Sequence, residues 1–236
     1  MLPEGAPRVP KSLKDPAVLA ARRALLESPH VAPIRALARR IADAQCAEVP
    51  DPDPLDGGIN ARLLLLLETP GPGIRGTGLV SRDNPTGTAA NLFRFLAEAG
   101  LSRRDTLIWN TIPWVIHARG ARNRAPRRSE ILAATPWLAP LVDGLPHLRV
   151  VILAGRIAGL LRPVLEALRP ACCVIPVPHP SPTYVCTAPS VAERIRAGLA
   201  HAAACIDGGH CACLAGNCPP MPLNAGDGPR SGTSSG

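Results

Sequence analysis

A carboxylic acid and an imidazole stand at equivalent places in this sequence, each shortly after an apolar run. Glu68 follows the five leucines 63–67, and His179 follows the run 173–177. Runs of this length bounded by Pro and Gly are typical of strands buried in a parallel sheet, where ligands bind at the carboxyl ends of the strands. A carboxylate can stabilise a developing cation and an imidazole a developing anion. The pair therefore suits an enzyme that separates charge across the bond it breaks.

Two further features concern the same predicted edge of the sheet. Asn110 follows the predicted strand 106–109, and its amide can donate and accept at once, as reading a pyrimidine edge requires. Taken alone, an Asn at this place is more often a turn residue. The Gly-Pro-Gly stretch 71–73 lacks the Lys-Ser/Thr pair of a phosphate-binding loop and is not expected to open directly into a helix, which argues against a nucleoside triphosphatase.

Predicted strands and helices alternate through most of the chain, which argues for an α/β fold with a parallel sheet covered on both faces. The strands are expected at 62–67, 106–109, 149–154 and 172–177. Helices are expected at 15–28, 30–47, 87–99, 156–168 and 190–204, and a further helix is expected to begin with Ser129 as its N-cap.

Three parts are expected along the chain. Residues 1–58 form an N-terminal helical extension that ends in a linker, because three prolines within 50–54 deny helix hydrogen bonds. Residues 59–206 form the catalytic domain. Residues 207–236 are rich in Gly, Pro, Ser and Asn, and we expect a disordered and dispensable tail.

Composition and charge indicate where the protein is located and what kind of partner it binds. No apolar run reaches membrane-spanning length and the start lacks the pattern of a secretory signal, so we expect no membrane contact and a cytoplasmic protein. The net charge of +8 favours a polyanionic partner, although an Arg-rich genome composition explains it equally well.

The eight cysteines fall into two groups of interest. Cys172 and Cys173 lie in a predicted strand and should be buried thiols. A second group lies near the end of the chain and consists of Cys205, His210, Cys211, Cys213 and Cys218. Its spacing lacks the paired C-x-x-C motifs of zinc knuckles, so reduced thiols on a flexible tail are expected, and no metal.

Taken in order, these segments resemble the uracil-DNA glycosylase superfamily over roughly residues 60–204, and most closely its iron–sulfur branch. That branch has Gly-Glu-x-Pro-Gly, matched at 68–71 with Leu67 in place of the first Gly, and an Asn after the next strand, matched by Asn110. Its Asn-Arg-x-Pro and His-Pro-Ser motifs are matched at 123–126 and 179–181. The resemblance implies a three-layer sandwich around a four-stranded parallel sheet.

The sequence departs from that branch at its cofactor and at its base pocket. Trp114 and about Ala134 stand where two cluster cysteines would be, and the N-terminal part offers only Cys46. Without four thiolates an iron–sulfur cluster has no ligand set, so no cofactor is expected. Pro85 stands at about the place of the aromatic residue that stacks on the base. Thr69 stands where other branches of the superfamily have the Asp or Asn that orients the nucleophile.

The resemblance implies a monofunctional DNA glycosylase of base excision repair, which hydrolyses the N-glycosidic bond of uracil or another deaminated base flipped out of DNA. Glu68 and His179 would be catalytic. Asn110, with Pro85 and Thr69, would bind the base.

The DNA itself would be held by Gly71, Arg124, Ser181 and, as a wedge in the vacated stack, Tyr184. The expected protein is a monomer associated with the nucleoid, with DNA as its partner and no metal. Two alternatives stay open, a non-catalytic module of the same fold that binds nucleic acid or protein, and a hydrolase of free nucleosides.

Overall fold

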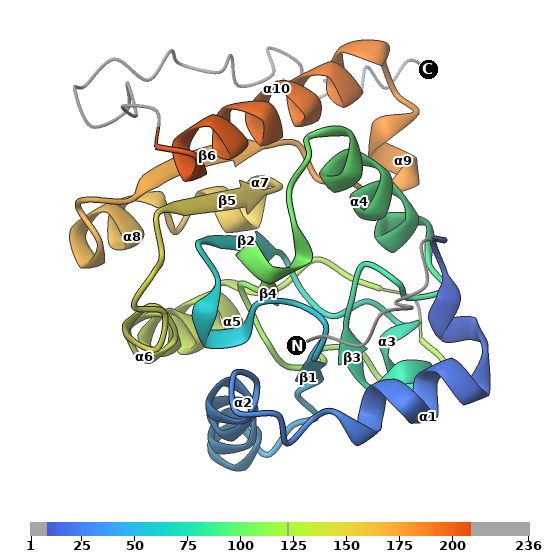
Figure 1. Cartoon of the computed structure of the whole chain (residues 1–236). Helices are drawn as coiled ribbons and strands as arrows, with labels where there is room; N and C mark the ends of the chain where they lie inside the picture. Colours follow the sequence, from blue (N-terminus) through green and yellow to red (C-terminus); the bar gives the residue numbers. More distant parts are fainter. Residues whose placement is uncertain (1–8, 122, 209–236) are drawn as a thin grey trace, which may run out of the picture.

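The computed structural model describes residues 9–121 and 123–208, and its centre is a four-stranded parallel sheet. The strand order is β4-β2-β5-β6, with β2 at Leu63–Leu67, β4 at Thr106–Asn110, β5 at Val150–Ala154 and β6 at Cys173–Val177 (Figure 1). All neighbouring strands run parallel, so their carboxyl ends share one edge of the sheet. That edge is where the sequence places its catalytic candidates.

One face of the sheet is covered by α4 (Gly87–Glu98) and α10 (Pro189–Ile206), seen together at the top of Figure 1. Phe95 of α4 and Leu199 of α10 pack in one core with alternate strand residues such as Leu65. Thr86 begins α4 because its hydroxyl accepts the Ala89 amide at 3.2 Å, a common N-cap. The apolar stripe of each helix is thereby buried against the sheet.

The opposite face is covered by helices from both halves of the chain. They are α2 (Ala32–Gln45), α5 (Arg128–Ala134), α6 (Leu138–Asp143) and α8 (Arg162–Leu168). Ile41 of α2, Leu141 of α6 and Leu165 of α8 pack in one core with Leu66. The predicted α/β class with helices on both faces of a parallel sheet is confirmed.

A second, smaller layer joins the N-terminal helix α1 (Pro16–Ala24) to the rest of the domain. Here β1 (Asp51–Pro52) pairs in parallel with β3 (Leu79–Val80), beside the short helix α3 (Ile74–Thr77). Six buried or nearly buried side chains form an ion network there, which we call the Arg/Asp cluster: Arg22, Arg82, Arg103, Asp53, Asp56 and Asp83.

The remaining elements are short. The 3₁₀ turns are η1 (Ser12–Lys14), η2 (Gly58–Asn60), η3 (Arg103–Asp105) and η4 (Thr135–Trp137), and the short helices are α7 (Arg156–Gly159) and α9 (Pro182–Val185). No helix within the described ranges is long and apolar enough to cross a membrane.

Several predicted details are wrong. Residues 50–54 are not a free linker, because Pro52, Asp53 and Pro54 are buried and part of the segment pairs as a strand. The predicted helix 156–168 is two helices, α7 and α8. Ser129 lies inside α5 rather than capping it, and the Glu130 carboxylate instead accepts the Arg127 amide at 2.6 Å.

Of the remaining predictions, one is confirmed and two are not tested by the described residues. Cys172 and Cys173 are buried, as predicted. The division at residue 58 stays a prediction, although α2 already belongs to the main core. Most of the predicted tail, from residue 209, lies outside the described residues.

Candidate active site

Glu68 stands directly beyond the end of β2, and the backbone after β5 holds its carboxylate in place. Its Oε1 accepts the Ile157 amide at 3.1 Å, at the start of α7. Gly155 lies beneath it with a φ of +104°, and a Cβ at this position would be 2.6 Å from Oε1. Glycine is required here because it tolerates this φ and leaves room for the carboxylate. Sequence reasoning missed this support, whose signal was a glycine directly after the strand.

His179 lies two residues beyond the end of β6, in a loop stiffened by prolines. The Ser181 amide donates to its Nδ1 at 3.1 Å, which assigns the ring proton to Nε2. Burial lowers the pKa of His179, although the charge of Glu68 acts in the opposite direction. At pH 7 the ring is therefore a neutral imidazole with an N–H to donate.

The two candidates share one edge of the sheet although β5 lies between their strands. The charge of Glu68 also acts on the pKa of His179. A carboxylate acceptor and a neutral donor thus belong to the same sheet edge, from segments more than a hundred residues apart. This arrangement can stabilise opposite charges on the two sides of one bond.

The start of α4 closes around the same edge. The Asn91 amide donates to the Pro180 carbonyl at 2.9 Å, which ties α4 to the His179 loop. A Cβ at Gly87 would lie 2.3 Å from Pro182, and one at Gly73 would lie 2.9 Å from the Thr86 methyl. The loops after β2 and β6 and the first turn of α4 therefore meet at Glu68 and His179.

The predicted base-binding residues lie around this meeting point with different exposure. Asn110 is the last residue of β4, rather than the first after it, and is only 3% exposed. It pairs in register with Leu67. Thr69 is half-buried, whereas Pro85 is exposed at the start of α4.

The residue before Pro85, Asn84, fixes the position of Pro85 through its side chain. Sequence reasoning did not predict this support. The buried Asn84 side chain accepts the Thr77 hydroxyl at 2.8 Å and donates to the Leu79 carbonyl at 2.8 Å. The position at which the stacking aromatic residue was expected is thus fixed by a buried hydrogen-bond pair.

The residues predicted to contact DNA are not equivalent. A Cβ at Gly71 would meet nothing within 4 Å, so the backbone there is open. Ser181 is half-buried, with its hydroxyl 3.2 Å from that of Thr183, and Tyr184 on α9 is 42% exposed. The Arg124 guanidinium, in contrast, binds the Glu130 carboxylate and the Ile116 carbonyl, the latter at 2.7 Å. Arg124 therefore braces its own loop.

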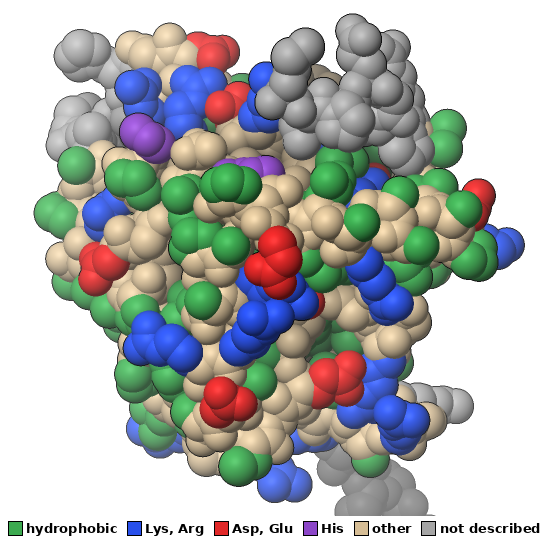
Figure 2. Space-filling view, turned by 60° about the horizontal axis from the view of Figure 1, so that its bottom comes forward, with side chains coloured by type: hydrophobic (Ala, Val, Ile, Leu, Met, Phe, Trp, Pro, Cys, Tyr) green, Lys and Arg blue, Asp and Glu red, His purple; other side chains and the backbone are tan. Residues whose placement is uncertain are grey.

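The positive charge of the chain is not gathered on the face shown in Figure 2, where Lys and Arg side chains are interspersed with Asp and Glu. In the arginine-rich segment 117–128, which leads into α5, Arg119, Arg127 and Arg128 are exposed, and Arg122 lies outside the described residues. These three exposed arginines can contact the phosphates of a nucleic-acid backbone.

A surface hollow lies elsewhere on the described part of the protein. It measures about 350 Å³ and is lined by Arg62, His147 and Arg149 among others, at the amino ends of the strands. A much smaller apolar gap lies beneath the His179 loop, between Pro178, Pro180 and the sheet. We take the region where the loops after β2 and β6 meet the start of α4 as the candidate site. Glu68 and His179 lie there, at the carboxyl ends of the strands, where parallel sheets bind ligands.

The places of the two cluster cysteines are occupied by packed apolar side chains. Trp114 and Ala134 are buried in the core that also contains α2 and α6. Cys46, the one cysteine of the N-terminal part, is exposed at the end of α2. The absence of an iron–sulfur cluster stays a prediction.

Comparison with known proteins gives one family. A model of the uracil DNA glycosylase superfamily matches residues 55–196, a segment that contains Glu68, Asn110, His179 and Tyr184. No curated protein matches the chain.

Proposed function

Because the chain belongs to the uracil DNA glycosylase superfamily, we propose that it is a monofunctional DNA glycosylase that excises uracil or another deaminated base. Hydrolysis breaks the bond between C1′ of the sugar and the base nitrogen, and the electron pair leaves with the base. Water adds to C1′ and loses a proton. Positive charge develops on the sugar and negative charge on the base, so each needs a partner.

His179 serves the leaving base. Its Nδ1 is occupied by the Ser181 amide and its pKa is lowered by burial, so a neutral ring presents the Nε2 proton. A neutral donor can stabilise the anionic base without first being protonated itself. One such donor is typically worth about 3 kcal/mol in the transition state.

Glu68 serves the sugar. Its Oε1 is fixed by the Ile157 amide, which leaves Oε2 to face the developing cation or the attacking water. The distance between such a carboxylate and the reacting carbon matters greatly, because misplacement by about 1 Å can cost about 100-fold in rate. The Gly155 turn is the device that sets this position.

Asn110 reads the base edge. It is buried at the end of β4 beside the catalytic edge, and its amide offers both a donor and an acceptor. Ser181 and the open backbone at Gly71 position the strand through its phosphates, which carry no sequence information. Arg119, Arg127 and Arg128, rather than Arg124, supply the salt-sensitive attraction to DNA.

Tyr184 is the candidate wedge, because it is exposed on α9 just beyond the His179 loop. Filling the vacated stack offsets an unstacking cost of a few kcal/mol. Tyr184→Ala should therefore slow excision from duplex DNA several-fold more than from single strands. Equal effects on the two substrates would assign Tyr184 to packing.

The observation that carries the proposal is the joint placement of Glu68 and His179, with their outer atoms left for a substrate. The test incubates the full chain with oligonucleotides that contain uracil, hypoxanthine, xanthine or a thymine mismatch, and scores abasic sites. The double variant Glu68→Gln, His179→Asn is the inactive control. Abasic sites from any of the four, absent with the control, support the proposal.

A non-catalytic DNA-binding module is the second candidate, favoured by Pro85 at the place of the stacking aromatic residue. It predicts salt-dependent DNA binding without abasic sites on any of the four substrates. Cleavage of free nucleosides with no measurable DNA affinity would instead identify a nucleosidase.

A further inference from the structure

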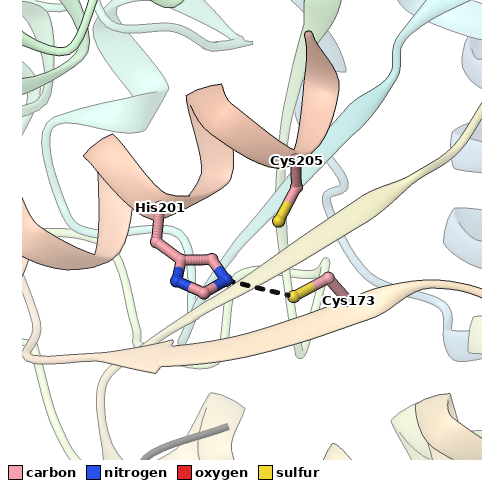
Figure 3. A group of neighbouring side chains, drawn as sticks. All are labelled: Cys173, His201 and Cys205. Atoms are coloured by element: carbon pink, nitrogen blue, oxygen red, sulfur yellow. Dashed lines mark hydrogen bonds between the residues drawn. The ribbon is translucent and has the colours of Figure 1, made fainter. Parts of the chain in front are cut away.

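Three metal-binding side chains meet at the edge of the sheet opposite Glu68 and His179. Cys173 is the first residue of β6, whereas His201 and Cys205 lie in the last turns of α10 (Figure 3). A separation of four residues puts His201 and Cys205 on one face of the helix. In Figure 3 both side chains point from the helix towards Cys173 on the strand.

The spacing of the donor atoms is close to that of a tetrahedral zinc site. The three ligand atoms lie within 4.8 Å of one another, and Cys173 Sγ is 3.8 Å from His201 Nε2. Zinc bonds of about 2.3 Å to sulfur and about 2.05 Å to nitrogen give tetrahedral edges of about 3.6–3.8 Å. Because no pair of donor atoms is more than 4.8 Å apart, an ion between them would require the pairs to close by at most about 1 Å.

The backbone that carries these side chains is packed closely. Gly198 lies one turn before His201, and a Cβ there would be 2.3 Å from Cγ1 of Val177 on β6. The missing side chain therefore lets α10 approach the strand. Cys173 is only 1% exposed, and His201 and Cys205 are half-buried, so an ion here would be enclosed on the protein side and open to one water.

The donor set selects the ion. Two thiolates and one imidazole suit Zn²⁺, whereas Ca²⁺ and Mg²⁺ require oxygen ligands. We infer that Cys173, His201 and Cys205 bind one Zn²⁺, with water in the fourth position, and that the ion fastens the end of α10 to β6. The expectation of no metal grouped Cys205 with the tail cysteines alone, because sequence gives no reason to join it to a strand thirty residues earlier.

The test uses the full chain, kept reduced, stripped with a chelator and titrated with Zn²⁺ against a chromophoric competitor. One equivalent should bind and raise the melting temperature. Cobalt in place of zinc should give thiolate-to-metal charge-transfer absorption. Cys173→Ala, His201→Ala and Cys205→Ser should each weaken binding at least 100-fold and abolish the rise in melting temperature.

Two controls separate this site from its neighbours. Cys172→Ser changes the adjacent cysteine, which packs on the opposite face of the sheet, and should bind zinc normally. The combined variant His210→Ala, Cys211→Ser, Cys213→Ser, Cys218→Ser should also bind one equivalent. Normal binding by Cys173→Ala, or loss of binding in the combined variant, would overturn the site. The outcome is independent of whether the protein cleaves DNA.

Discussion

The Arg/Asp cluster and the Glu68–His179 site both contain charged or polar side chains that are at least partly buried, but these side chains have different numbers of partners. In the cluster, Asp53 receives Arg22 at 2.6 Å, Arg103 at 2.7 Å and the Leu55 amide at 3.0 Å. At the site, Glu68 and His179 each have one backbone partner and keep an outer atom uncommitted among the described contacts. The fully paired Asp53 holds the structure together, although the Asp56 carboxylate in the same cluster has no hydrogen-bond partner among the described residues and depends on the charges of Arg82 and Arg103. At the site, the uncommitted atoms of Glu68 and His179 are available to a ligand.

One loop connects the two regions. Asp83 is bound by Arg22 and Arg103 in the cluster, at 2.9 and 2.8 Å. Three residues later, Thr86 begins α4, whose first turn contacts the His179 loop. The cluster is therefore the anchor of the segment that carries Pro85 to the site, and the comparison can be tested by breaking each region separately.

The largest effect is expected from breaking the cluster. Arg22→Met leaves Asp53 and Asp83 sharing Arg103, and an uncompensated buried charge costs about 3–5 kcal/mol of unfolding free energy. Urea denaturation measures this loss. The control Arg162→Met removes an exposed pair with Glu166 and should cost below about 1 kcal/mol. Similar small losses in both variants would show that the cluster is not an anchor.

Breaking the site should affect the reaction rather than the fold. His179→Ala and Glu68→Gln should each lower kcat about 100- to 1,000-fold, with DNA binding and urea midpoint nearly unchanged. Single-turnover excision and an anisotropy titration separate the two readouts. If binding falls as much as cleavage, these residues hold the DNA and do not act on the transition state.

The pH dependence should distinguish two aspartates of the same cluster. Burial raises the pKa of Asp56 to about 6, against the charges of Arg82 and Arg103. Although burial acts to raise the pKa of Asp53 too, Arg103, Arg22 and Ser81 together hold it below its usual value. The folded state thus binds the Asp56 proton more tightly than the unfolded chain does, and the Asp53 proton less tightly.

The stabilisation from protonated Asp56 is complete below about pH 4 and is lost as the pH rises through about 6, a change of up to about 3 kcal/mol. The advantage of wild type over Asp56→Asn should shrink over this range. The advantage over Asp53→Asn should grow as the pH rises from acid, because ionised Asp53 is the stabilising form. Urea titrations from about pH 2 to 7.5 check both trends, because the Asp53 change falls below about pH 4 and the Asp56 change between about pH 4 and 6. Parallel trends would contradict them.

The smallest effect is expected at Gly155. Gly155→Ala adds a Cβ 2.6 Å from the Glu68 carboxylate at a φ of +104°. We expect about tenfold slower excision and a stability loss of about 1–3 kcal/mol from backbone strain. Gly159→Ala, whose Cβ would meet nothing within 4 Å, is the matched control and should be neutral or slightly stabilising. Equal rates in the two variants would remove Gly155 from the positioning of Glu68.

The strands and the place of the candidate site could be predicted because each depends on short, local patterns. Leucines 63–67 admit few alternatives to a buried strand, and polar residues directly after it must lie at the sheet edge. The family motifs extended this to Asn110 and His179, and a family model matches the same segment.

What sequence could not supply were pairings between distant residues. Asp53, Asp56 and Asp83 look like linker and loop acids until three arginines reach them from separate segments. The ion pair between Arg124 and Glu130 was likewise not visible, because Glu130 belongs to the next helix. Gly155 and Gly198 each permit one close approach, which only the folded chain shows.

The position of α2 also has a consequence for synthesis. Its residues Ile34, Leu37 and Ile41 pack in a core completed by α6, α8 and the last two strands, up to Val174. During translation β1, η2 and β2 follow this helix closely, but α6, which also packs on it, is made only after β2 and β4 of the sheet. The apolar face of the first long helix is therefore only partly covered until the second half of the chain is synthesised.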